Sequence, residues 1–465
     1  MGRPLVPPGP LADPAERAAE QRAWYFYDWA NSAFVTTTGA VLYGPYLTAV
    51  AENAACGRVG TPEDPCTGTL DVLGIPVAAG SLAPYAVTFA TLLSVLILPI
   101  VGAIADRTSR KRHMLAVFAW VGAIGAASMF FVSGSNWLLG VVLLVTTSLL
   151  LGSSLVINDA ILCEIAEESD RDRVSSRGWA LGYLGGGLLL AANLVLLTVL
   201  PFGLTRGEAV RISLLTAGVW WGLWTLVPFR GLRDRPPVAV VATAAQQGPL
   251  GSAFGQLRQT LRHARGYPQT LLFLFAYVFY NDGIQTVIYA ASIYGNRQLG
   301  LSESTLIAAI LMVQFIAFGG ALLLGRIASR IGSKRTILAA LVLWTVVVGA
   351  AFFLPARQVV PFLVIAVAIG IVLGGSQALS RSLFSLLVPR GKEAEYFSLY
   401  QAAERGTSWF GALLFGLVFQ FTGSYRNAIV ALIVFFIVGF IALSRVDVQR
   451  GIEQAGNEVP AVLRT

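Results

Sequence analysis

The segments GAIADRTSRKR, at residues 102–112, and GRIASRIGSKR, at residues 325–335, resemble one another and begin 223 residues apart. Each follows an apolar run and places basic residues in a short turn. A repeat with so long a period decides the architecture before single residues are interpreted. The same separation aligns LGSSLVIND, at residues 151–159, with GGSQALSRS, at residues 374–382, so that Asn158 corresponds to Arg381. We therefore predict a chain built from two duplicated halves.

The composition is that of a membrane protein. Of 465 residues, 55% are hydrophobic and 12% are charged, and the mean hydropathy is +0.69, which is unlike a soluble domain. Apolar windows long enough to cross a bilayer, about 20 residues each, recur along the chain. Lipid cannot hydrogen-bond an exposed backbone, and the windows lack the alternation of a membrane barrel, so they must be helices. The predicted fold is all-α and polytopic, with twelve transmembrane helices near residues 24–50, 82–105, 113–133, 137–163, 178–200, 212–229, 270–294, 304–326, 336–355, 360–385, 398–421 and 426–444.

The repeat divides these spans into two sets of six. We expect a six-helix bundle over residues 1–229, a cytoplasmic linker over 230–269, and a second bundle with a short tail over 270–465. Basic residues gather on the side that holds both termini and the linker, whereas the opposite side has only isolated arginines. The positive-inside rule places that side in the cytoplasm. The net charge of +8 is thereby explained without nucleic acid, and the expected location is the cell membrane.

A second repeat lies in the first span of each half. The motif D-x-x-[NQ]-[ST] begins at Asp28 in YFYDWANSAF and at Asp282 in YNDGIQTVIY, 254 residues later. The larger separation agrees with a longer first outer loop. Carried upstream, it lays Pro14 on Pro268, each near a helix start, where proline is tolerated. Charges inside a bilayer are costly and commonly mark substrate or proton pathways, so both carboxylates are functional candidates.

Two joined six-helix halves resemble the major facilitator superfamily, and the segment at 102–112 resembles its signature G-x-x-x-D-R-x-G-R-[RK]. In that comparison Gly102 permits close helix approach. The Gly that precedes the basic pair in the signature is Ser109 here, and in the second copy Ser329 replaces the acidic residue, so only the first copy keeps a full latch. The resemblance implies a charged latch at the cytoplasmic face, formed by Asp106, Arg107, Arg110 and Lys111.

Four further segments, YDWANSAF, SSRGWALGYLGGG, YNDGIQTVI and GGSQALSRSLF, resemble the vacuole-effluxer branch of that superfamily, which is related to autophagy-associated fungal amino-acid effluxers. The resemblance implies a proton-coupled secondary transporter that moves a small polar solute by alternating access, with amino-acid efflux favoured. A sugar or another organic solute is the alternative substrate, and a non-transporting membrane sensor is the alternative class. We expect a monomer without a cofactor.

The candidate binding and coupling residues are polar side chains within spans one, four, seven and ten, which line the cavity in the superfamily. An amino acid is zwitterionic, so Arg381 suits its carboxylate, and Asp282 or Asp28 suits its ammonium group. Asp282, further from the start of its span, is the first candidate for the proton, and the two acidic faces are expected to meet across the cavity. The full set is Asp28, Asn31, Asn158, Asp282, Gln285, Tyr289, Gln377 and Arg381.

A competing interpretation makes some of these charges a gate. Arg381 and Asp159 lie near the inner ends of their spans, and buried charges commonly pair with one another. Asp28 and Arg381 would then join the halves without touching the solute. Arg405, adjacent to Glu404, is expected to anchor the inner membrane surface or the latch. The glycines of GYLGGG, at 182–187, predict close helix packing.

The remaining candidates concern cysteine, metals and catalysis. Cys56 and Cys66 bound CGRVGTPEDPC in the first outer loop, where either a disulfide or two free thiols would fit; we favour the disulfide. Two His and three Cys leave little for a metal site. An enzyme is not expected, because the sequence has no evident nucleophile–base pair and no P-loop.

Overall fold

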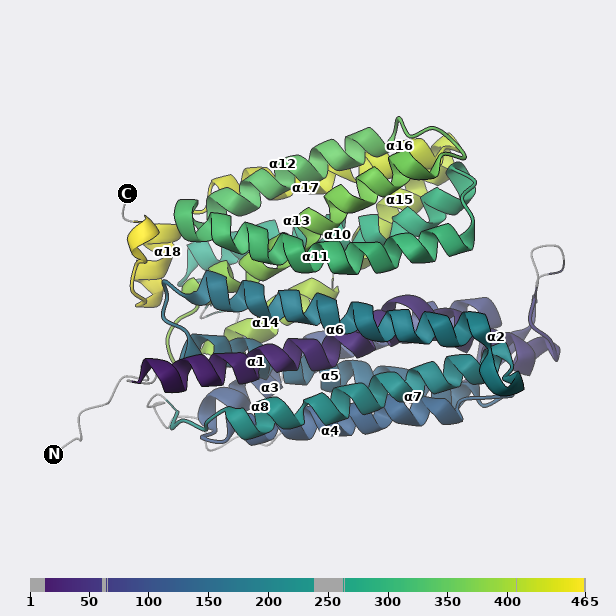
Figure 1. The fold of residues 1–465 in the computed structure, drawn as a ribbon, viewed down its shortest axis with the longest axis horizontal. Helices are drawn as coiled ribbons and strands as arrows, with labels where there is room; N and C mark the ends of the chain where they lie inside the picture. The colour runs from purple at the N-terminus through teal and green to yellow at the C-terminus, as the bar shows by residue number, and fades with distance from the viewer. Residues whose placement is uncertain are drawn as a thin grey trace.

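Two bundles of helices lie side by side in the computed structural model, with the amino-terminal bundle below the carboxy-terminal one in Figure 1. The structure describes residues 13–60, 64, 66–237, 262, 264–406 and 408–463. Residues 238–261 and 263, which form most of the predicted linker, lie outside this set. One end of the bundles holds both the start of helix α1 and the short helix α18 (Val448–Ala455). We call it the terminal end.

The first bundle holds six spans. They are α1 (Pro14–Phe34) with the π-helix η1 (Val35–Leu42) and α2 (Tyr43–Cys56), α3 (Leu82–Arg107), α4 (Lys111–Ser128), α5 (Trp137–Ile165), α6 (Arg171–Val199), and α7 (Arg206–Trp224) with α8 (Leu226–Gly231).

The second bundle repeats this plan. Its spans are α10 (Pro268–Ile293), α11 (Glu303–Ile331), α12 (Ser333–Ala351), α13 (Val359–Leu386), α14 (Glu393–Gly406) with α15 (Ser408–Thr422), and α16 (Tyr425–Ala431) with α17 (Ile433–Ser444).

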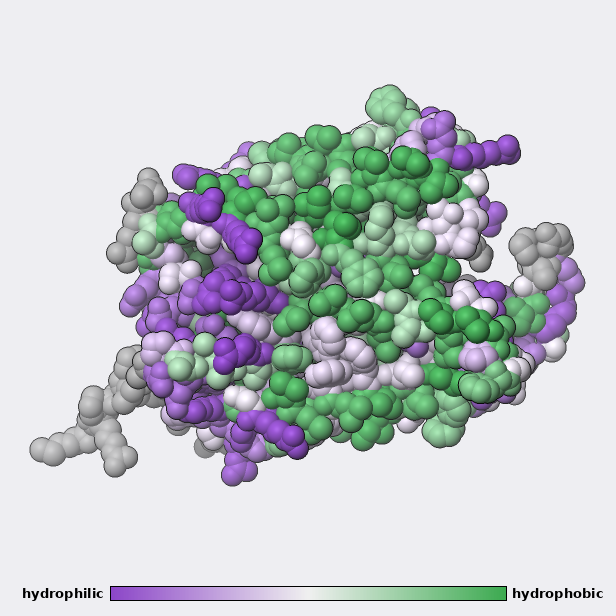
Figure 2. Space-filling view, viewed as in Figure 1, coloured by the Kyte–Doolittle hydropathy of each residue, from purple (hydrophilic) through white to green (hydrophobic). Residues whose placement is uncertain are grey.

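The predicted all-α polytopic fold is confirmed. Within the described ranges, 10 helices are long and apolar enough to cross a membrane. The first and eleventh spans are not among these ten; the first contains the π-helix η1, and residue 407, between α14 and α15, lies outside the described residues. Apolar residues cover the middle of the face drawn in Figure 2, and hydrophilic residues gather at the terminal end. This distribution is the one that a bilayer requires.

The predicted start of the first span at residue 24 was wrong. Helix α1 begins at Pro14, and the side chain of Asp13 caps it by accepting a hydrogen bond from the Ala15 amide at 2.8 Å. Hydropathy missed these turns because they are polar: Glu16 and Arg22 are exposed, and Gln21 is buried against protein. Glu20 is buried there, and arginines after α8 bind it, as described below.

A small hairpin stands at the opposite end, which we call the hairpin end (Figure 1). Strands β1 (Thr69–Val72) and β2 (Ile75–Ala78) pair antiparallel, an element that hydropathy did not indicate. Cys56 and Cys66 are joined by a disulfide at its base. The part of the first outer loop from Cys66 onward is therefore folded.

The duplication is visible in helix packing. Pro14 and Pro268 each occupy the first turn of their helix. A side chain at Gly182 on α6 would collide with the Ser32 hydroxyl. A side chain at Gly411 on α15 would likewise collide with the hydroxyl of Thr286, the residue matched to Ser32 by the repeat. The same glycine–hydroxyl contact is thus built once in each half.

The glycines of α6 pack against α1. Gly178, Gly182 and Gly186 are four residues apart and share one helix face. A Cβ at Gly178 would meet Asp28 and Trp24, and one at Gly186 would meet the Thr36 hydroxyl at 2.6 Å. This is the close packing that the sequence predicted, and it brings α1 near enough for Asp28 to reach the other half.

Candidate functional site

Arg381 lies at the centre of a buried ionic cluster between the halves. From α13 its Nη2 donates to Asp28 Oδ2 at 2.8 Å, and its Nη1 donates to Asp28 Oδ1 at 3.2 Å. The same Nη1 donates to Asp159 Oδ1 on α5 at 3.3 Å. All three side chains are buried. Removing one partner from such a pair costs roughly 3–5 kcal/mol because it leaves an uncompensated charge.

The guanidinium of Arg381 has no donor to spare. Its Nε donates to Ser175 Oγ at 3.0 Å, and Nη2 also donates to the Ser175 backbone oxygen at 3.2 Å. With the three bonds to the carboxylates, these contacts equal the five N–H groups that arginine possesses. The indole rings of Trp24 and Trp179 lie 4.7 and 5.4 Å from the guanidinium carbon, within cation–π distance.

Two amides extend the cluster on its acidic side. Asn158 Nδ2 lies 3.5 Å from Asp28 Oδ1, at the limit of a hydrogen bond. Gln401, on α14, donates from Nε2 to Asp159 Oδ2 at 2.8 Å. Residues of α1, α5, α6, α13 and α14 therefore meet at one point, with Asp28 and Asp159 from the first half and Arg381 and Gln401 from the second.

A second set of polar groups lies further along α13. Gln377, one turn before Arg381, donates from Nε2 to Asn281 Oδ1 at 2.9 Å. Asn281 Nδ2 in turn donates to the backbone oxygen of Glu404 at 3.4 Å. These contacts join α10, α13 and α14 within the second half.

Asp282 occupies a different environment from Asp28. It is 1% exposed, and neither carboxylate oxygen has a hydrogen-bond partner among the described residues. Its nearest contacts lie within the second half, where Gly411 on α15 packs against Thr286, one turn further on. Asp28 instead binds Arg381, and the expectation that the two acidic faces meet across a cavity stays a prediction.

The remaining candidates of spans one and seven have separate surroundings. Asn31 donates from Nδ2 to the Tyr27 backbone oxygen of its own helix at 2.6 Å. Gln285 is half-buried. Tyr289 is 60% exposed. The structure gives these three side chains no contact with Arg381.

The predicted latch residues divide into two pairs. Asp106 accepts hydrogen bonds from the backbone amides of Ala394 and Glu395, at 2.9 and 2.8 Å, where α14 begins. Lys111 Nζ lies 3.6 Å from Asp106 and 2.7 Å from Glu164. A negative charge is favourable at a helix N-terminus, so this contact ties the halves together.

The other two latch residues stay outside this contact. Arg107 and Arg110 are exposed, and within the described ranges the structure gives their side chains no ion pair. Gly102 lets α14 approach closely, because a Cβ there would collide with the Ala394 carbonyl group.

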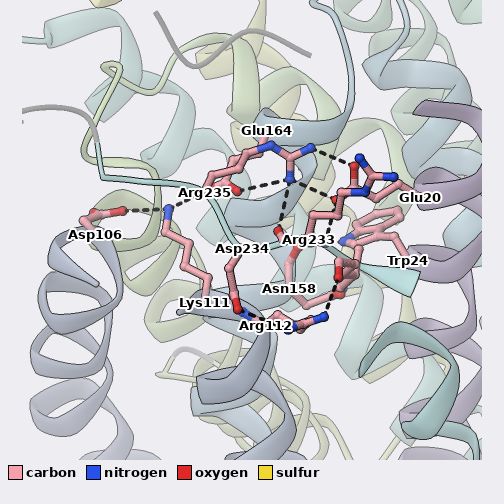
Figure 3. Close-up of polar contacts among 11 residues, drawn as sticks. Glu20, Trp24, Asp106, Lys111, Arg112, Asn158, Glu164, Arg233, Asp234 and Arg235 are labelled. Atoms are coloured by element: carbon pink, nitrogen blue, oxygen red, sulfur yellow. Dashed lines mark hydrogen bonds and ion pairs between the residues drawn. The ribbon is translucent and has the colours of Figure 1, made fainter. Parts of the chain in front are cut away.

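Residues 232–237, which we call the strap, cross the terminal end of the first half. Arg235 forms two hydrogen bonds with Glu20, at 2.9 and 2.7 Å, and lies 3.8 Å from Glu164. Burial disfavours its charged form, but the bonds and charges of Glu20 and Glu164 outweigh this and hold the Arg235 pKa above its ordinary value. Figure 3 shows these contacts as a chain that runs through Lys111 to Asp106.

Contacts between the halves gather toward the terminal end. Arg171 donates to the Ser385 backbone oxygen at 2.8 Å, and Ser175 Oγ donates to the Ala378 backbone oxygen at 2.7 Å. Nearer the hairpin end, Gln314 donates to the Thr36 hydroxyl at 3.0 Å, about halfway along α11. The halves are therefore closed on each other at the terminal end.

A cavity of about 300 Å³ lies at this closed end. Both halves and the strap line it, with Glu164, Arg171, Arg235, Arg390 and Glu393 among the charged groups. Exposed residues such as Arg390 and Glu458 are part of its lining, so it lies at the surface of this end.

A family model described as "Vacuole effluxer Atg22 like" matches residues 16–456. The chain belongs to this family. It is 28% identical over 452 residues to the uncharacterized MFS-type transporter YxiO of Bacillus subtilis strain 168, a match that covers 95% of this chain and 98% of the relative. It is 26% identical to autophagy-related protein 22 of Vanderwaltozyma polyspora, covering 93% of this chain and 92% of that protein.

Solved structures share the fold of this Atg22-like chain. The proton:xylose symporter XylE, bound to 6-bromo-6-deoxy-D-glucose, superposes with a TM-score of 0.68 at 13% identity, covering 92% of this chain and 95% of XylE. A bacterial homologue of the iron transporter ferroportin, in an outward-facing state, gives 0.64 at 13% identity, covering 92% and 98%. The Atg22-like chain is thus a multi-pass major facilitator transporter of a small-molecule solute, not an enzyme.

The sequence did not indicate several residues of the cluster in this Atg22-like chain. Trp24, Ser175, Gly178 and Gln401 carry no charge, so nothing separated them from ordinary helix packing. The prediction that Arg405 anchors the surface was wrong, because its Nε is buried beside α5 and has no described hydrogen-bond partner. The spacing of Gln401 and Arg405 by one helical turn was the available signal.

Proposed function

We propose that this Atg22-like chain is a proton-coupled secondary transporter that exports an amino acid across the cell membrane by rocking residues 1–229 against 270–445. The observation that carries the proposal is the buried cluster of Asp28, Asp159 and Arg381, which joins the two halves. Such a cluster is suited to alternating access, because rocking the halves must break it. The vacuole-effluxer description of the family supports export.

The proposed orientation places the terminal end in the cytoplasm. The strap arginines and the latch lie at that end, and an excess of arginine and lysine favours the cytoplasmic side. The disulfide of Cys56 and Cys66 lies at the hairpin end, where an oxidising exterior would preserve it. With this orientation the closed terminal end makes the state outward-facing. We propose that the chain acts as a monomer.

The two acidic residues receive different proposed roles. Asp28 and Arg381 form the gate, since every donor of Arg381 is already occupied and none remains for a solute carboxylate. Asp282 takes the proton, because a buried carboxyl that has no ion-pair partner among the described residues is stabilised by protonation far more than a paired one. Asn31, Asn158, Gln285, Tyr289 and Gln377 are proposed to contact the solute.

Transport by purified protein in proteoliposomes tests the proposal. A panel of radiolabelled L-amino acids and sugars is offered with and without an imposed pH gradient, beside protein-free liposomes. We expect amino-acid uptake that the gradient increases. Uptake of a sugar alone would contradict the proposed substrate class. If no solute moved under any gradient, the proposal of a transporter for amino acids or sugars would be wrong.

A further inference from the structure

Three buried primary amides each leave a carbonyl oxygen without a partner. Asn158, Gln377 and Gln401 are 0%, 3% and 4% exposed. Each donates a hydrogen bond through its nitrogen, yet its oxygen has no hydrogen-bond partner among the described residues. Buried polar atoms of this kind are rare in proteins and call for an explanation.

The partners of these amides fix which way they point. Ionised Asp28 and Asp159 only accept hydrogen bonds, so Asn158 and Gln401 must turn their nitrogens toward them. The Glu404 backbone oxygen also only accepts, so Asn281 turns its nitrogen to it. The Asn281 oxygen then faces Gln377, whose nitrogen must face back. Rotating any of the amides would set acceptor against acceptor, so the free atoms are acceptors.

A free donor lies one helical turn from the nearest of these oxygens. Arg405 follows Gln401 by four residues on α14, so the two share a face and their Cβ atoms are about 5–6 Å apart. The Arg405 Nε is buried without a described hydrogen-bond partner and lies 3.6 Å from a Cβ built at Gly152 on α5.

The depth of Arg405 separates it from the gate. It lies 12 residues after the start of α14, or about 18 Å from the terminal end. Arg381 lies only 5 residues before the end of α13, or about 7.5 Å. Arg405 is therefore nearer to the middle of the membrane, where carriers of this architecture bind their substrates.

We infer that Arg405 binds the carboxylate of a zwitterionic amino acid and that the free oxygens of Gln401, Asn158 and Gln377 receive its ammonium group. The inference rests on the proposed function and names both ends of its substrate. The solute carboxylate is thereby assigned to Arg405, whose Nε has no described hydrogen-bond partner, and no longer to Arg381, whose donors are occupied. Arg405 is then a specificity-determining residue on the eleventh span.

The test compares three probes in proteoliposomes. The first probe is L-leucine. The second, 3-methylbutylamine, lacks its carboxylate, and the third, 4-methylpentanoate, lacks its ammonium group. Matched analogues replace them if another amino acid gives the highest uptake. Wild-type protein should bind the amino acid about ten- to a hundredfold more tightly than either analogue, the range of one charge-assisted hydrogen-bonding contact.

Binding of each probe is measured by its competition with uptake of the labelled amino acid. Arg405→Gln should weaken binding of the amino acid and of the acid at least about tenfold, and leave binding of the amine unchanged. Gln401→Leu should do the reverse, weakening the amino acid and the amine but not the acid. Arg177→Gln, which removes an exposed arginine from α6, is the matched control and should change none of the three.

The outcomes separate the inference from the proposed function. If wild-type protein transports amino acids and Arg405→Gln still discriminates acid from amine as wild type does, the inference is wrong and the proposed function stands. Arg405→Gln could instead weaken the binding of all three probes equally, with Arg405→Lys restoring none of the acid binding. Arg405 would then have a structural role, and the inference would be wrong. If wild-type protein transports no amino acid, both fall.

Discussion

Asp28 and Asp282 lie at the same distance from the prolines that begin α1 and α10, yet only Asp28 has an ion-pair partner. Each follows its proline by 14 residues, or about 21 Å along the helix. The expectation that Asp282 lies deeper was therefore wrong. The difference arises on the matched fourth and tenth spans, where Asn158 stands in one half and Arg381 in the other.

Replacing Arg381 should open the closed end. Arg381→Gln leaves Asp28 and Asp159 unpaired, which costs roughly 3–5 kcal/mol in a buried site. Cys163 reports the change, because its thiol is free and its Sγ lies 3.9 Å from the Ser385 backbone oxygen of the other half. We expect its alkylation by a maleimide to accelerate about tenfold or more, and no acceleration would contradict the gate.

Filling Gly178 should separate Asp28 from Arg381. The methyl group of Gly178→Ala would collide with Asp28 and Trp24, and overpacking of this kind costs about 1–3 kcal/mol. Thermal unfolding in detergent and amino-acid uptake should both decline. Gly416→Ala on α15, where no atom lies within 4 Å of the added group, should change stability by less than about 0.5 kcal/mol. Equal losses in the two variants would contradict the contact.

Neutralising Asp282 should uncouple transport from the proton gradient. Asp282→Asn keeps the size of the side chain but cannot bind and release a proton. We expect gradient-driven accumulation to disappear while exchange of labelled for unlabelled amino acid continues at nearly the wild-type rate. Accumulation that survives the substitution would rule out this role.

The latch predicts an unequal response from neighbouring charges. Asp106→Asn weakens the bonds to the α14 amides and removes the charge that faces Lys111, so maleimide labelling of Cys163 should accelerate. Arg107→Gln and Arg110→Gln are matched controls from the same turn, because both side chains are exposed. Acceleration in the controls equal to that in Asp106→Asn would show that all four residues act together.

The fold was predictable because hydropathy and the internal repeat are two independent signals in the sequence and both indicate the same architecture. Twelve apolar windows gave the helices, and the copies at 102–112 and 325–335 gave the two halves. Hydropathy missed the start of α1 because it reports exposure to lipid, not helix formation, whereas the repeat had already matched Pro14 to the helix start at Pro268. The hairpin of β1 and β2 was missed because short strands leave little signal.

The site was predictable only where it is charged. Asp28, Asn158 and Arg381 were found because polar groups stand out in apolar windows. Gly178 and Ser175 were missed because their part depends on how α6 is rotated against α1 and α13, which packing decides. Arg405 was misplaced because its neighbourhood is polar in sequence but buried between α14 and α5 in the folded chain.

Several contacts that close the terminal end are made to main-chain atoms of the other half. Arg171 and Ser175 donate to the carbonyl oxygens of Ser385 and Ala378, and Asp106 accepts from the amides that begin α14. Every residue supplies the same carbonyl oxygen, and every residue except proline the same N–H group, so other changes of side chain at these partner positions leave the closure intact. The two halves can therefore differ in side chains at these partner positions, as they do at the matched pair Asn158 and Arg381, and still hold on to each other.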